Sequence, residues 1–503
     1  MKQEVCIRRM WHQHEKNNRK SANMGTSILS PRRHLNRGVM TFVTLLLFAT
    51  MATLVWNYEG VQRLVKLVPT EGFSIGAKRP TNVLTPNLSK ENETSTGSDS
   101  LKKEDSAAIP VEIKPLQPLV VDLTILKGAV AKGAVCLDGS PPGYHLHRGN
   151  GVNARNWVVF LEEGAWCESE AACQLRARAH LGSSRWMNVR TFEGILSNSE
   201  KVNPDFYNWN RVFVRYCDGA SFSGNMSLSV KDKGKVLQYR GESIWNAIID
   251  DLIEKKGMKN ADKALLGGCS AGGLSSILHC DKFKTALPSA NVVKCMSDAG
   301  FFVDTKTYKG ENKIQAYFKS VVDLQNVTDT LPKYCTEKRN PIECFFPQYL
   351  LSQMKTPLFV VNGAYDWWQM DNIVAPDPLG EWDHCKNNAS RCTAAQLNII
   401  QGYRQELLDA LKPIQESKKH GMFIDGCFHH CQASYDAFWS GQYAPHVNGQ
   451  TASQALGDWY FERDTKTNSV VDCAFPCNPT CPPKTSGALS VGRPSFRNWS
   501  KRG

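Results

Sequence analysis

Short apolar runs alternate with stretches of helical periodicity between residues 116 and 484. The runs whose length and β-branched or aromatic content predict buried strands cover 156–163, 211–218, 263–268, 291–298 and 356–363. Residues 241–257 instead place apolar side chains at helical spacing and stop at Gly257. The order of helix, strand, glycine turn and helix over 241–280 predicts an α/β fold, with a mostly parallel central sheet flanked by helices.

An uncharged run at residues 39–56 has a different character, because it is apolar on every face. At a rise of about 1.5 Å per residue it spans about 27 Å, enough to cross a thin bilayer. Arg32, Arg33 and Arg37 precede the run, so the positive-inside rule predicts a type II signal anchor with residues 1–38 in the cytosol. A cleaved signal peptide is the alternative, but its basic lead would be unusually long.

Residues 57–115 are rich in Ser, Thr, Asn and charge and poor in aromatic side chains, which predicts a disordered stem. Sequons for N-glycosylation, all on the predicted lumenal side, begin at Asn87, Asn92, Asn225, Asn326, Asn388 and Asn498. After the cytosolic tail, the anchor and the stem, we expect a catalytic domain over 116–484 and a C-terminal tail over 485–503.

The formal net charge of +12 is concentrated at the N-terminus. Residues 1–38 hold nine Lys or Arg and two acids, which leaves only +5 for the rest of the chain. The sequence contains no arginine-rich arm in its body, no zinc-finger spacing and no RNP-like strand. We therefore expect no nucleic-acid partner.

Sixteen of the 17 cysteines, from Cys136 to Cys481, follow the predicted anchor. An even and dense set on one side of a membrane segment predicts disulfides in a secretory compartment. Cys473, Cys477 and Cys481 are spaced C-x3-C-x3-C among prolines, with no histidine nearby, which favours a stapled tail over a zinc site. We expect no metal and no cofactor.

The sequence Gly268-Cys269-Ser270-Ala271-Gly272 follows a predicted strand and precedes a predicted helix. This G-x-S-x-G pattern is typical of a sharp strand-to-helix turn that exposes a nucleophilic serine, with small neighbours and a helix N-terminus facing the developing oxyanion. Ser270 is therefore the predicted nucleophile. Cys269 precedes it, where its side chain points elsewhere, so we expect Cys269 to be structural.

A serine nucleophile needs a base and an acid that orients the base, in the chain order Ser, acid, His for this fold. Asp366 follows the predicted strand 356–363 and is the first candidate acid; Asp298, which ends the strand 291–298, is the second. The candidate histidines are His420, His429, His430 and His446.

The histidines differ in their surroundings. His420 lies in a charged stretch, which predicts a surface position. His429 and His430 lie between Cys427 and Cys431, whose disulfide bonding would pin the loop, so one of these two histidines is the predicted base. Acyl transfer also needs backbone N–H groups aimed at the oxyanion. We expect Ala271 to supply one, and Gly164 and Ala165 in the stretch LEEGAWC to supply the others.

Several stretches together resemble one known family. They are CLDGSPPGYHLHRG (136–149), NPDFYNWNRVFVRYCDGASFSGN (203–225), GGCSAGG (267–273), NGAYDWWQ (362–369) and CFHHCQ (427–432). In this order they resemble the plant pectin acetylesterases and the related animal Notum carboxylesterases, which remove a lipid from Wnt proteins. The family motif has a small residue before its histidine, which assigns the catalytic position to His430 instead of His429.

The resemblance implies an α/β-hydrolase fold, a Ser270–Asp366–His430 triad without a metal, and removal of O-acetyl groups from galacturonan. Acetylated pectic polysaccharide is then the expected partner of a monomeric enzyme. The expected location is the membrane of the secretory pathway or the cell wall. Other readings are a deacylase of another acetylated polysaccharide or of a lipidated protein, and a glycan-binding pseudoenzyme.

Two positions depart from the family's glycine-rich oxyanion loop, E-G-G-G-W-C. Glu163 and Ala165 stand where the family has glycine. An alanine that must adopt positive φ is strained by about 1 kcal/mol. A carboxylate at 163 that pointed inward would oppose the oxyanion and repel an anionic polymer.

Overall fold

The central strands form because their side chains alternate between two covered faces. In β4 (Trp157–Leu161), Val159 packs in one core cluster and Phe160 in the other. The first cluster also holds Leu274 of α5 (Ala271–Ala286), and the second holds Leu456 of α13 (Ala452–Phe461). The sequence therefore forms a sheet with helices on both sides, as the apolar runs predict.

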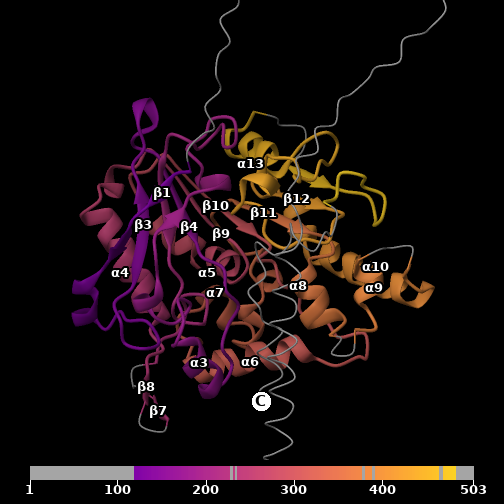
Figure 1. Cartoon of the computed structure of the whole chain (residues 1–503), viewed down its shortest axis with the longest axis horizontal. Coiled ribbons are helices and arrows are strands. Elements are labelled where there is room, and N and C mark those ends of the chain that lie inside the picture. The colour runs from indigo at the N-terminus through magenta and orange to yellow at the C-terminus, as the bar shows by residue number, and fades with distance from the viewer. Residues whose placement is uncertain are drawn as a thin grey trace, which may run out of the picture. The chain divides into compact units, whose positions relative to one another are not determined.

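The computed structural model describes residues 118–482, apart from 227–229, 233–234, 377–379, 388–390 and 464–467. Nine of the described strands form one sheet in the order β13-β12-β11-β10-β9-β4-β6-β3-β2 (Figure 1). All neighbours from β13 to β6 are parallel, and only β3 and β2 are antiparallel additions. The strands of the sheet are β2 (Leu123–Ile125), β3 (Gly143–His147), β4, β6 (Asn210–Val214), β9 (Lys263–Gly268), β10 (Val292–Asp298), β11 (Leu358–Gly363), β12 (Gly421–Asp425) and β13 (Ser469–Val471).

Two short ribbons lie outside this sheet: β1 (Val120–Val121) with β5 (Arg190–Thr191), and β7 (Val230–Asp232) with β8 (Lys235–Leu237). The α5 helix packs on β4, β9 and β10, and α13 packs on β11 and β12. The remaining α-helices are α3 (Glu170–Arg176), α4 (Gly241–Glu254), α6 (Lys313–Gln325), α7 (Lys333–Thr336), α8 (Trp367–Gln369), α9 (Asp383–Asn387), α10 (Ala394–Ala410), α11 (Lys412–Gln415) and α12 (Asp436–Trp439). Short 3-10 turns are η1 (Lys127–Lys132), η2 (Gly151–Asn153), η3 (Ser184–Trp186), η4 (Gly194–Leu196), η5 (Met258–Asn260), η6 (Glu343–Phe345) and η7 (Pro347–Tyr349), and η8 (Met370–Val374) is a π-helical turn.

The predicted strands and the predicted helix are confirmed, with shorter ends. The run 211–218 stops pairing at Val214, because the amide of Tyr216 turns to the side chain of Glu162 instead of to a strand. Since β4, β9, β10, β11 and β12 are parallel, their carboxyl ends meet at one edge of the sheet. The loops that carry the predicted site residues all begin there.

The sixteen cysteines from Cys136 onward form disulfides, which confirms that prediction. The pairs are Cys136–Cys217, Cys167–Cys173, Cys269–Cys431, Cys280–Cys295, Cys335–Cys344, Cys385–Cys392, Cys427–Cys481 and Cys473–Cys477. Cys427 and Cys431 pair with distant partners and not with each other. The tail is stapled through Cys473–Cys477 and Cys427–Cys481.

Several predicted parts lie outside the described residues: the cytosolic tail 1–38, the anchor 39–56, the stem 57–115 and the tail 485–503. Within the described ranges, no helix has the length and apolar character that a bilayer span requires.

Candidate active site

Ser270 stands at the turn between β9 and α5, with φ 55° and ψ −122°. Its amide donates to the carbonyl of Asp298, with N and O 2.9 Å apart. A Cβ on Gly268 would lie 2.3 Å from the Gly272 carbonyl oxygen, and one on Gly272 would lie 2.2 Å from the Leu161 carbonyl oxygen. The turn therefore needs glycine at both positions, which is the physical reason for the G-x-S-x-G pattern.

Asp366 follows β11 and caps α8, where its Oδ1 accepts the amide of Gln369 at 2.9 Å. Its Oδ2 lies 2.6 Å from Nδ1 of His430. Asp366 is fully buried, and 9% of the His430 side chain is exposed. The rings of Trp367 and Trp368 lie against the imidazole, at centroid distances of 5.4 and 6.5 Å, and limit its rotation.

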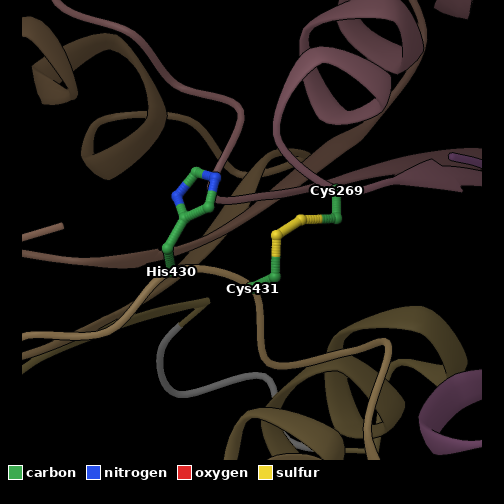
Figure 2. A group of neighbouring side chains, drawn as sticks. All are labelled: Cys269, His430 and Cys431. Atoms are coloured by element: carbon green, nitrogen blue, oxygen red, sulfur yellow. A yellow bond between two sulfur atoms is a disulfide. The ribbon is translucent and has the colours of Figure 1, made fainter. Parts of the chain in front are cut away.

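The fold brings His430 next to the turn that carries Ser270. A ring nitrogen of His430 lies within 4.8 Å of the sulfur of Cys269, the residue before Ser270. Figure 2 shows that His430 and Cys431 are neighbours on one loop. The side chain of Cys431 is joined there to that of Cys269. Within the described residues, no hydrogen bond joins Ser270 Oγ to a histidine. Such contacts are often long in enzymes without substrate and tighten when it binds.

His429 has a different partner. Its Nε2 lies 2.7 Å from Oδ1 of Asp425, at the end of β12, and the pair is buried. Burial lowers the pKa of His429, but the Asp425 carboxylate more than offsets this and raises it above the ordinary value. The two neighbouring histidines are thus each paired with an aspartate at the end of a parallel strand, and only His430 is paired with Asp366.

Asp298 is not paired with a histidine. Its Oδ2 instead accepts the backbone amides of Gln432 and Ala433, both at 2.7 Å. Of the two candidate acids, the structure therefore brings Asp366 to the imidazole of His430 and gives Asp298 to the backbone of the same loop.

Two carbonyl groups of the loop after β4 accept hydrogen bonds from side chains. The Gly164 carbonyl accepts Nη1 of Arg176 at 2.7 Å, and the Ala165 carbonyl accepts the Tyr216 hydroxyl at 2.9 Å. In a trans peptide the carbonyl and the following N–H point in opposite directions, so the N–H of Ala165 points away from Arg176. No hydrogen bond found among the described residues uses the amide of Gly164, Ala165 or Ala271. These amides can therefore bind an oxyanion.

Both departures in this loop have structural consequences. Ala165 has φ 51°, in the left-handed region, so the expected strain is present. Glu163 is half-buried, and its Oε2 is buried without a hydrogen-bond partner. Burial lowers the pKa of Arg190, but the charges of Glu163 and Glu162 more than offset this and raise it. Glu162 itself is paired with Arg215 at 2.9 Å.

The predicted surface position of His420 is wrong. His420 is buried at the start of β12, where its Nδ1 accepts the amide of Leu358 at 3.0 Å. Burial and the charge of Lys419 lower its pKa to about 4. The charged stretch ESKKHG predicted exposure, but its histidine directly precedes β12 and bonds to the first residue of β11. His446 is exposed and lies on another loop.

A second string of the same residue types occurs on α5, where Ser275 Oγ lies 3.3 Å from His279 Nδ1 and His279 Nε2 lies 3.3 Å from Glu242. Ser275 and His279 are buried, and His279 Nδ1 also lies 3.0 Å from the Ser275 carbonyl. No substrate can reach this serine, so the string is structural.

Sequence reasoning missed Asp425, Arg176 and Tyr216. Asp425 ends the short apolar run GMFID in the same manner as Asp298 ends its own run, so a search for carboxylates at strand ends would have found it. Arg176 and Tyr216 act through long-range contacts with backbone carbonyls, and no local pattern marks them.

Comparisons with known proteins identify the family of the chain. Residues 115–482 match the pectinacetylesterase family. Pectin acetylesterase 11 of Arabidopsis thaliana is 46% identical over 387 residues, which cover 76% of this chain and 98% of the relative. Pectin acetylesterase 7 of the same plant is 47% identical over 367 residues, covering 72% and 93%.

A solved structure of the Wnt deacylase Notum from Drosophila matches with a TM-score of 0.61 at 25% identity, covering 72% of this chain and 100% of that chain. The mostly parallel sheet, the flanking helices and the disulfides fit this relationship. The chain is a carboxylic ester hydrolase with an α/β-hydrolase fold, and it belongs to the pectin acetylesterase family.

Proposed function

We propose that the chain removes O-acetyl groups from pectin by a serine acyl-enzyme mechanism, with Ser270 as nucleophile, His430 as base and Asp366 as orienting acid. The observation that carries the proposal is the hydrogen bond of 2.6 Å between Asp366 and His430, beside the strained turn at Ser270. When Nδ1–H of His430 donates its hydrogen bond to Asp366, Nε2 of the same imidazole has a free lone pair that can accept the serine proton.

Acylation begins when Ser270 Oγ attacks the acetyl carbonyl carbon and its proton passes to His430 Nε2. The carbonyl oxygen becomes an oxyanion, which accepts hydrogen bonds from the amides of Ala271, Gly164 and Ala165. When the intermediate collapses, the ester bond to the sugar oxygen breaks, and His430 returns its proton to that oxygen. The sugar hydroxyl leaves, and the acetyl group remains on Ser270.

Deacylation repeats these steps with water. His430 takes a proton from water, the hydroxide attacks the acetyl carbon, and the bond to Ser270 Oγ breaks as the proton returns to the serine. Acetate is released and the enzyme is restored. Asp366 orients the imidazole and stabilises the imidazolium in both halves. The chain's own residues supply each proton transfer in this scheme.

Pectin is the substrate we favour because the relatives with the highest identity reported above are named for it. Eight disulfides support a route through an oxidising secretory compartment. A single-pass type II anchor at 39–56 and a monomeric state remain part of the proposal, untested by the described residues.

Acetate release from acetylated pectin by the full chain tests the proposal. Ser270→Ala should lower kcat on the order of 10⁶-fold. Asp366→Asn should lower it about 10⁴-fold, because an amide would hold the imidazole in the wrong tautomer. Asp323→Asn, an exposed partner of Lys319 in α6, is the control and should change nothing. Equal activity of Ser270→Ala and the native chain would refute the mechanism.

A second acyl substrate is favoured by one observation, the structural match to a Wnt deacylase. Hydrolysis rates on p-nitrophenyl esters of increasing chain length separate the two. We expect p-nitrophenyl acetate to be hydrolysed faster than the esters with longer chains, and we expect acetylated pectin to be hydrolysed as well. A preference for long chains, with no release from pectin or another acetylated glycan, would favour a lipidated protein instead. Binding to pectin without any ester hydrolysis would indicate a pseudoenzyme.

A further inference from the structure

Asp298 contacts both parts of the proposed machinery through two different groups. Its carbonyl accepts the amide of Ser270 at 2.9 Å. Its side-chain Oδ2 accepts the amides of Gln432 and Ala433, both at 2.7 Å. These two amides lie two and three positions after His430, in the segment 427–436 that we call the histidine loop. One residue at the end of β10 thus joins the serine turn to the histidine loop.

The carboxylate of Asp298 lies in an unfavourable place for a charge. The residue is fully buried, and its Oδ1 has no hydrogen-bond partner among the residues that the structure describes. Burial raises its pKa to about 6, although the amides of Ala433 and Gln432 act in the opposite direction. Burying a carboxylate costs free energy unless hydrogen bonds to the charged form compensate. The two short bonds to the histidine loop provide this compensation, because charge-assisted hydrogen bonds are the stronger kind.

Other contacts also hold the histidine loop, among them the Cys427–Cys481 disulfide and the pair His430–Asp366. The Cys269–Cys431 disulfide joins the residue before Ser270 to the residue after His430. The side chain of Gln432 donates to Oδ2 of Asp425 at 2.9 Å. Asp425 also accepts the amide of Cys427 at 3.0 Å and lies 2.7 Å from Nε2 of His429. Asp298 differs in holding two consecutive backbone amides, two and three positions after His430, so it restrains the backbone that leads away from this imidazole.

We propose that Asp298 is a positioning residue, which holds His430 beside Ser270 by fixing the backbone of Gln432 and Ala433. The inference rests on the proposed roles of Ser270 and His430. Asp298 does not touch the reacting atoms. Its loss should reduce kcat and leave KM unchanged, since displacement of a catalytic group by about 1 Å can cost on the order of 100-fold in rate.

The chain contains a matched control. Asp218 is also fully buried, its Oδ2 accepts two backbone amides, those of Ala220 and Phe222, at 3.0 and 2.9 Å, and its Oδ1 also has no partner. Burial raises its pKa to about 6 as well. Asp218 holds a different loop, residues 218–222, from which the Ser221 hydroxyl donates to the carbonyl of Ala271 at 2.8 Å. Substitutions at Asp218 and Asp298 should therefore destabilise the fold alike, and only those at Asp298 should displace His430.

The experiment compares the full native chain with Asp298→Ala, Asp298→Asn, Asp218→Ala and Ser270→Ala, using p-nitrophenyl acetate hydrolysis, fluorophosphonate labelling and thermal unfolding. We expect Asp298→Ala to lose about 100-fold in kcat with KM within about twofold. Asp298→Asn keeps an acceptor oxygen and should recover part of the loss. Asp218→Ala should lower the unfolding temperature similarly and leave hydrogen exchange in the histidine loop unchanged. No loss of kcat in Asp298→Ala would overturn the inference.

Amide hydrogen exchange keeps the test independent of activity. In Asp298→Ala the histidine loop should exchange faster than in the native chain, and in Asp218→Ala it should not. If the native chain neither hydrolyses the ester nor labels at Ser270, the proposed function fails, and the exchange contrast still decides whether Asp298 anchors the loop. Unchanged exchange in the loop of Asp298→Ala would overturn the anchor.

Discussion

Ala165 occupies a backbone conformation that favours glycine, with φ 51°. Hydrogen bonds on both sides keep it there: Arg176 holds the carbonyl of Gly164, and Tyr216 holds the carbonyl of Ala165. The surrounding contacts therefore impose the strain on the alanine, and the orientation of its N–H is retained. A strained residue at this position is consistent with a role in binding an oxyanion.

Replacing Ala165 by glycine should stabilise the fold by about 1 kcal/mol, because the Cβ penalty of the left-handed region is removed. Thermal unfolding of the full chain measures this. Ala316→Gly, at an exposed position within α6, is the opposite control and should destabilise by about 1 kcal/mol. Equal losses in both variants would show that Ala165 is not strained.

Glu163 is the other unusual residue of the loop, and its charge acts on Arg190 and Tyr435. Burial raises the pKa of Tyr435, and Glu163 raises it further. Glu163→Gln removes one negative charge close to where an anionic polymer would bind. The KM for acetylated pectin should fall by about twofold to fivefold at low ionic strength, and salt should abolish the difference. The KM for neutral p-nitrophenyl acetate should stay constant, and a parallel fall there would contradict the electrostatic explanation.

At the scale of the elements, the site depends on how closely α5 approaches β4. Gly272, in the first turn of α5, faces the carbonyl oxygens of Leu161 and Glu162 at the end of β4. A Cβ there would lie 2.2 Å and 2.7 Å from these two oxygens. Both are backbone atoms and cannot rotate away. The helix that carries Ala271 is thus positioned by contact with the strand that leads to Gly164 and Ala165.

Gly272→Ala should therefore destabilise the fold by about 3 kcal/mol and reduce esterase activity, because α5 must move away from β4. Gly402, within α10, has no atom within 4 Å of an added Cβ. Gly402→Ala should instead stabilise the fold by about 0.5–1 kcal/mol, through the higher helix propensity of alanine. Denaturation with the disulfides intact measures both, and a tolerated Gly272→Ala would refute the close approach.

The elements could be predicted because their causes are local. Apolar runs identified the central strands, and glycine spacing identified the turn at Ser270. The partners of that turn are set by distant contacts. Asp298 ends one parallel strand and Asp366 closely follows another, so local pattern could not decide which one faces His430. The same limit explains why Cys431 could not be assigned to Cys269, 162 positions away.

At the scale of the whole molecule, the fold buries both acidic and basic side chains, and burial shifts their pKa values in opposite directions. Burial raises the pKa of Asp218 and Asp298 from 3.8 to about 6. Burial lowers the pKa of His145 and His420 from 6.5 to about 4. As pH falls from 6.5 to 4, the folded state loses stability through the histidines, which must stay neutral inside. Over the same range it gains stability through the aspartates, which bind protons more readily folded than unfolded.

Removing one aspartate should expose this balance. In Asp218→Asn the gain is absent, so its free energy of unfolding should fall relative to the native chain as the pH is lowered from 7.5 to 4. A shift from 3.8 to about 6 corresponds to about 2 kcal/mol over that interval. Urea unfolding at both pH values gives the difference in free energy of unfolding between the native chain and Asp218→Asn. This gap must be larger at pH 4 than at pH 7.5. A gap that stays constant would mean that the carboxyl of Asp218 titrates normally in the folded chain, and a gap that narrows would mean that its pKa is lowered. In either case Asp218 would no longer match Asp298 as a buried carboxylate with a raised pKa.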